Sequence, residues 1–192
     1  MGSTEKLCAE LENNRRQLRE VLQKAESLVE GLDADAARWR PAPDRWSVSE
    51  CLDHLNATSR PYLSDLAATV EQAKARGVFG DRPPKRGWLG SWFIGTLEPP
   101  PTRAFKAPKL FIPAQAPELT TVMEEFRSHK KRWDELLVES NGLDLWKVKM
   151  RMSAFKLIKM SLGEIYAFLL AHERRHLWQA EQVVAHPEFS RR

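Results

Sequence analysis

Three of the five histidines in this chain have the residue type and spacing of a metal site. His172 and His176 lie four residues apart in an apolar stretch that is predicted to be helical, so their side chains lie one above the other on a single face. His54 falls in a second helical stretch, one turn after Cys51. Neutral imidazoles bind divalent metals, and three of them leave one coordination position open. The expected chemistry is that of a divalent metal with an exchangeable position.

The segment from His172 to His176 also matches the H-E-x-x-H pattern of zinc proteases, in which Glu173 would be the general base for a water on the metal. Few residues follow His176, and Gln179 and Gln182 stand where the extended motif has glycine and histidine. The sequence also predicts no sheet whose edge could hold an extended peptide. These features argue against a protease. Glu173 is kept as a candidate catalytic residue, with pairing to an adjacent arginine or to a neighbouring helix as the alternative.

Four long stretches of helical periodicity must position these residues. The second and the fourth stretch each begin with a capping box. Ser47 and Glu50 form the first of these boxes, and Ser161 and Glu164 form the other. Glycine or proline follows each stretch, and Pro61 predicts a kink inside the second. The expected helices run over residues 4–30, 47–77, 117–142 and 161–185.

The segment between the second and third helices, residues 77–116, holds most of the prolines, yet it also carries Trp92, Phe93 and Phe111. Disordered segments are poor in aromatic residues, so we expect an ordered crossover with a short helical turn at 88–94. Its aromatic side chains are suited to wall a metal pocket or to form a dimer face. Later in the chain, an extended piece is expected around 146–152.

These elements predict an all-α fold, a four-helix bundle with a long Pro-rich crossover between helices 2 and 3, in one domain over residues 1–192. The net charge of +4 is small and scattered, which excludes the basic footprint of a nucleic-acid-binding protein. No apolar run is long enough to cross a membrane. The chain has only two cysteines and no secretory leader before its first charged segment, so a cytoplasmic location is expected.

Two motifs in this chain resemble those of the DinB-like (DinB/YfiT) superfamily: Trp46-Ser47-x-x-Glu50-x-x-x-His54 and His172-Glu173-x-x-His176-x-x-Gln179. The resemblance implies an up-down-down-up four-helix bundle. It also implies that His54, His172 and His176 bind a divalent metal, most often zinc or nickel. Iron is compatible with the same ligands, because imidazole suits all three metals. A homodimer is a further implication of the resemblance.

Characterised members of that superfamily include thiol transferases that use bacillithiol or mycothiol, and a mycothiol-dependent isomerase. The resemblance therefore implies an enzyme that transfers a low-molecular-weight thiol to a small-molecule electrophile. Three neutral ligands leave the metal its full charge, which lowers the pKa of a bound thiol. They suit the activation of water equally well. A metal-dependent hydrolase and a non-catalytic, stress-related metal-binding protein stay open as alternatives.

Other residues receive looser predictions. Glu50 and Gln179 are candidate partners that hold the imidazoles in one tautomer, although Glu50 also serves the capping box. Trp46 is expected in the core rather than in the site. His129 lies in a charged run and His186 beside a helix stop, so neither is expected in the site.

Overall fold

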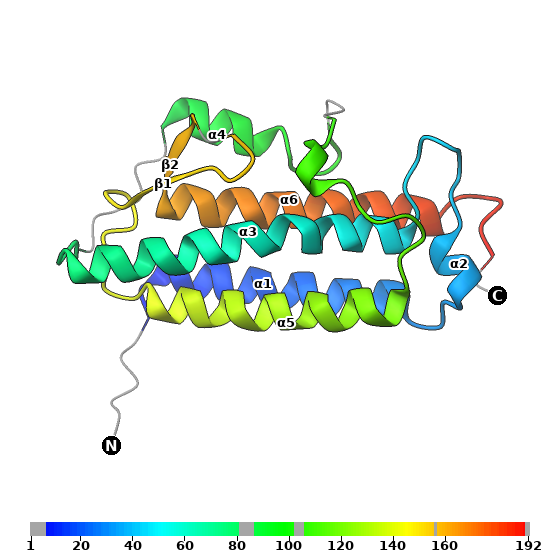
Figure 1. Cartoon of the computed structure of the whole chain (residues 1–192), viewed down its shortest axis with the longest axis horizontal. Helices are drawn as coiled ribbons and strands as arrows, with labels where there is room; N and C mark the ends of the chain where they lie inside the picture. Colours follow the sequence, from blue (N-terminus) through cyan, green and yellow to red (C-terminus); the bar gives the residue numbers. More distant parts are fainter. Residues whose placement is uncertain (1–6, 81–86, 102–105, 156, 191–192) are drawn as a thin grey trace, which may run out of the picture.

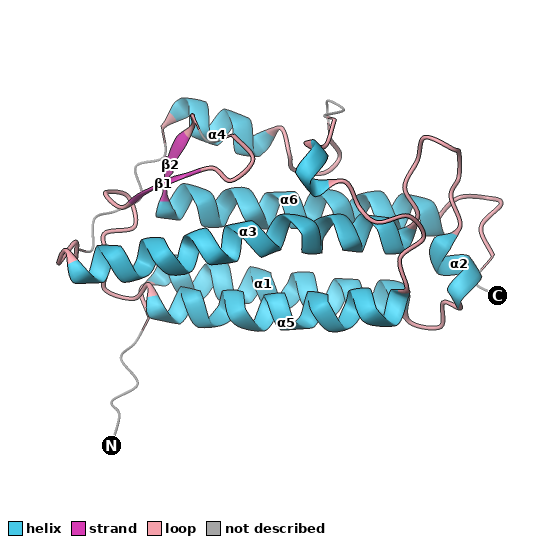
Figure 2. Cartoon of the chain, in the orientation of Figure 1, coloured by secondary structure: helices cyan, strands magenta, loops and turns pink. Residues whose placement is uncertain are grey.

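A computed structural model of the chain describes residues 7–80, 87–101, 106–155 and 157–190. Helices make up most of it (Figure 2), so the prediction of a mostly helical chain is confirmed. The long helices are α1 (Ala9–Val29), α3 (Val48–Ala75), α5 (Leu119–Glu139) and α6 (Leu162–Val184). The shorter elements are α2 (Ala34–Arg38), α4 (Trp88–Gly95), the 3-10 turn η1 (Lys109–Phe111), and the antiparallel strands β1 (Lys149–Arg151) and β2 (Lys159–Ser161).

The four long helices lie side by side (Figure 1). Both α1 and α3 pack against α5 and α6, so the contacts between the four helices close into a ring. The colours in Figure 1 show α1 and α6 running in one direction and α3 and α5 in the other. Because α3 and α5 are parallel neighbours, the chain between Arg76 and Glu118 must return along the length of the helices. On this return, α4 contacts α6, and η1 contacts α3.

Local sequence accounts for where the helices that carry the histidines begin. Ser47 Oγ accepts a hydrogen bond from the Glu50 amide at 3.2 Å, and the Glu50 carboxylate accepts one from the Ser47 amide at 2.9 Å. Ser161 and Glu164 form the same reciprocal pair at the start of α6. Such caps satisfy backbone N–H groups that have no partner within the helix. The structure has α3 continuous through Pro61.

Two apolar clusters form the core, and the histidines lie where they meet. On α3, residues up to Leu55 belong to one cluster and residues from Tyr62 onward belong to the other. On α6, the change of cluster falls between Ala171 and Leu177. Each fully buried leucine or phenylalanine stabilises the fold by about 1.5–3 kcal/mol. The site is therefore supported by packed side chains on both sides along the helix axes.

The sequence prediction of the shorter elements was incomplete. The helical turn expected at 88–94 corresponds to α4, and the extended piece at 146–152 contains β1. The helix α2 and the strand β2, which pairs with β1 just before α6, were not predicted. Residues 4–6 of the expected first helix lie outside the described residues. Among the described helices, none combines the length and apolarity needed to span a membrane.

Candidate metal centre

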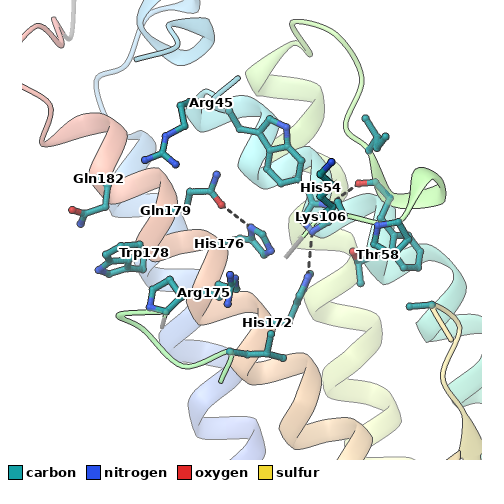
Figure 3. Close-up of a pocket in the computed structure, with 18 of the residues that line it drawn as sticks. Arg45, His54, Thr58, Lys106, His172, Arg175, His176, Trp178, Gln179 and Gln182 are labelled. Atoms are coloured by element: carbon teal, nitrogen blue, oxygen red, sulfur yellow. Dashed lines mark hydrogen bonds between the residues drawn. The ribbon is translucent and has the colours of Figure 1, made fainter. Parts of the chain in front are cut away.

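The structure brings together the three histidines that the sequence singled out (Figure 3). His54 comes from α3, and His172 and His176 come from α6. Each offers one ring nitrogen, and the three nitrogens all lie within 4.8 Å of one another. The Nε2 atoms of His54 and His172 are 3.2 Å apart. A tetrahedral zinc ion about 2.0–2.1 Å from each nitrogen holds its ligands about 3.3 Å apart, so this donor set fits a divalent metal.

Hydrogen bonds on the other ring nitrogens orient two of the imidazoles. His54 Nδ1 donates to the backbone carbonyl of Phe111 at 2.6 Å, and His176 Nδ1 donates to Gln179 Oε1 at 3.1 Å. We assign the tautomers from these acceptors, because a carbonyl oxygen accepts only from a protonated nitrogen. Each Nε2 then presents a lone pair toward the centre, which is the form that binds metal. Gln179 thus has the contact that its predicted role requires.

Burial keeps these imidazoles neutral. Desolvation lowers the pKa of His54, and it lowers the pKa values of His172 and His176 well below the usual range. The neighbouring guanidinium of Arg175 lowers the pKa of both α6 histidines further. Neutral imidazoles do not offset the charge of a bound cation, so the cation would retain its full power to polarise a ligand.

Trp46 lies against the site rather than deep in the core. Its ring centroid is 4.7 Å from that of His54 and 5.8 Å from that of His176. Trp46 also packs against one of the two apolar clusters, so the prediction that it is a core residue holds, but it lines the cavity as well. Glu50 caps α3 and forms an ion pair with Arg40, and both contacts are away from the imidazole nitrogens.

The carboxylate of Glu173 is directed at α5. It is buried and forms an ion pair with Lys130, which is itself only 2% exposed. The Lys130 ammonium also lies 4.3 Å from the centroid of the Phe126 ring and 5.2 Å from that of Trp133. Pairing with a neighbouring helix, the alternative weighed for Glu173, is what the structure shows. Its catalytic role stays a prediction.

A cavity of about 1210 Å³ opens beside the three histidines. Phe93 and Phe111 of the crossover line it, whereas Trp92 is exposed. His186 also lines the cavity, but its ring packs against Trp39 at a centroid distance of 5.3 Å, and it is not one of the three clustered histidines, as expected. His129 lies elsewhere, with its ring nitrogen 3.3 Å from Asn56 Oδ1.

Sequence reasoning missed several polar residues of this cavity, namely Arg45, Thr58, Lys106 and Arg175 (Figure 3). Arg175 stands beside a metal-site motif, but its neighbour Arg174 faces Glu98 and Gln17 instead. Only the packing of the crossover over α3 and α6 makes these residues part of one site. No spacing rule along the chain marks them.

Replacing Gln179 by leucine should weaken metal binding by about 10–100-fold, because His176 would lose the acceptor that fixes its tautomer. A competition titration against a chromogenic chelator measures this affinity. Gln182→Leu, one turn later on α6 and also lining the cavity, is the matched control and should bind metal like the wild type. An equal loss in both variants would show that Gln179 does not act through His176.

Comparison with known proteins gave one match. The family model described as the DinB superfamily matches residues 17–180, a range that includes all three histidines. Neither the curated proteins nor the solved structures gave a match.

Proposed function

We propose, from the premise that this chain belongs to the DinB superfamily, that it is a metal-dependent enzyme. His54, His172 and His176 would hold the divalent ion, with zinc or nickel proposed from the family resemblance, since the three imidazoles by themselves suit iron as well. The observation that carries the proposal is the convergence of three neutral ring nitrogens from two helices beside a cavity large enough for a small-molecule substrate.

The same family match supports the finer description of the fold. We infer an up-down-down-up four-helix bundle in a single domain over residues 1–192, which is consistent with the ring of helix contacts. Cys8 and Cys51 are free thiols, which supports a reducing, cytoplasmic location. The exposed apolar side chains of Trp92, Leu110 and Ile112 support a homodimer.

The proposed reaction is transfer of a low-molecular-weight thiol to an electrophile. A divalent metal with three neutral ligands lowers the pKa of a bound thiol and so supplies thiolate at neutral pH. The sulfur forms a bond to the electrophilic carbon, the leaving group departs with its electron pair, and the thiol proton goes to solvent. Arg45, Lys106 and Arg175 outnumber Asp44 among the charged residues that line the cavity, and this excess of positive charge favours a thiol with an anionic group. Trp46 packs on two of the histidines and shields that side of the site from water.

A direct spectrophotometric assay on zinc-loaded or nickel-loaded protein tests this function. Chlorodinitrobenzene is the electrophile, cysteine is the thiol, and the thioether product is followed by its absorbance. We expect product formation above the spontaneous rate only when metal, protein and thiol are all present. Consumption of the electrophile without thiol would indicate a hydrolase instead. Bound metal without turnover of this or other thiol and electrophile pairs would indicate a metal-binding protein.

A further inference from the structure

Thr58 is a buried polar residue that the proposed reaction does not use. It follows His54 by one turn on α3, so the two side chains lie on the same face of the helix. It lines the cavity (Figure 3), and the residue is only 3% exposed. Its hydroxyl has no hydrogen-bond partner among the residues that the structure describes.

An unpartnered buried hydroxyl destabilises a folded protein, because it has lost its water and gained nothing in return. Valine has nearly the same shape as threonine and would remove this cost. A threonine in this position is therefore explained best by a partner that arrives with a ligand. The hydroxyl can both donate and accept a hydrogen bond, so it suits a carbonyl, hydroxyl or amide group.

The cavity wall beyond Thr58 is aromatic. Because α3 and α6 are antiparallel, the residues after His54 on α3 and those before His172 on α6 lie at the same end of the cavity. The Tyr62 ring lies 5.8 Å from that of Phe168, and the Phe93 ring lies 5.9 Å from it and nearly parallel. Phe168 in turn lies 6.0 Å from the His172 ring, so this wall is continuous with the candidate metal centre.

The opposite end of the cavity is different in character. Gln179 and Gln182 follow His176 on α6, and Arg45 lies beside Gln179 (Figure 3). The three histidines thus separate an end that carries Arg45, Gln179 and Gln182 from an end walled by aromatic rings. A ligand that contacts the metal can reach both ends, and each end selects a different chemical group.

We propose that the apolar end is a subsite for an aromatic or similarly flat apolar group of the substrate, and that the Thr58 hydroxyl positions this group by hydrogen bonding to a polar atom next to it. We define this aromatic subsite by Thr58, Tyr62, Phe93 and Phe168. The inference rests on the proposed function, because the metal would anchor the other part of the ligand. It adds the class of electrophile: an aryl compound that carries a hydrogen-bonding atom near its reactive centre.

Two small hydroxamates test the subsite by isothermal titration of zinc-loaded protein. Benzohydroxamate and acetohydroxamate bind zinc through the same two oxygens and differ in the phenyl ring. The wild type should bind benzohydroxamate at least about 10-fold more tightly than acetohydroxamate, because burial of the phenyl ring removes apolar surface from water. Equal affinities on a protein that holds zinc would overturn the inference and leave the proposed function standing. A wild-type protein that takes up no zinc would overturn both.

The Thr58→Val variant tests the hydroxyl. Its affinity for benzohydroxamate should fall by about 3–10-fold, while the melting temperature of the ligand-free protein should rise by about 2–4 °C. Thr58→Ser keeps the hydroxyl and should keep the affinity. Thr69→Val is the matched control, since Thr69 is half-buried on the same helix and its hydroxyl already donates to the Asp65 carbonyl at 2.7 Å. An unchanged benzohydroxamate affinity in Thr58→Val, with zinc content intact, would overturn the role of Thr58.

Discussion

The His172→Ala variant is expected to lose its metal and, with it, all measurable activity. The His172 ring contacts both other candidate ligands, with ring centroids 5.1 Å from His54 and 4.6 Å from His176. A change to a residue that only supports a ligand costs about 10–100-fold in metal affinity, so loss of a ligand should cost more than about 100-fold. Elemental analysis of protein purified without chelator or nickel resin gives the metal content per chain.

The fold should survive this change, because His172 is partly exposed to the cavity and the packed core lies to either side of it. Circular dichroism should show helix content close to that of the wild type. His129→Ala is the control, since this histidine lies on α5 and bonds to Asn56. A His172→Ala protein with a full equivalent of metal and full activity would disprove the assignment of the site.

The Lys130→Met variant should be destabilised by about 3–5 kcal/mol, because it leaves the Glu173 carboxylate buried without its counter-ion. The second oxygen of that carboxylate already lacks a hydrogen-bond partner among the described residues. For a chain of this size the change corresponds to a fall in melting temperature of about 6–20 °C. Urea unfolding followed by circular dichroism measures it. Lys131→Met, at the exposed neighbouring position, should change stability by less than about 0.5 kcal/mol.

The double variant Lys130→Met/Glu173→Leu should recover most of the lost stability, because replacing both members of a buried ion pair with apolar residues is often neutral or stabilising. If the double variant is no more stable than Lys130→Met, the ion pair is not the cause of the loss. The same protein also tests the catalytic role predicted for Glu173. A stable double variant that binds metal and turns over substrate normally would show that Glu173 supports the fold only.

The helices and the cluster of three histidines could be predicted from the sequence for a local reason. Helix periodicity and capping boxes such as Ser47 with Glu50 depend on residues within one or two turns of each other. The spacing of His172 and His176 fixes their common face in the same way. His54, which stands far from them in the chain, was a candidate because it falls on a second predicted helix, and the resemblance to a family strengthened its assignment.

Only the tertiary structure decided what each side chain faces. Consecutive residues on a helix point about 100° apart, and α6 is packed against α1, α3 and α4. His172 therefore faces α3, whereas the next residue, Glu173, reaches Lys130 on α5. Thr58 and Phe93 share a cavity because the crossover folds back over α3 and α6. A sequence determines local periodicity through neighbouring residues, but contacts between distant segments follow from how the helices pack.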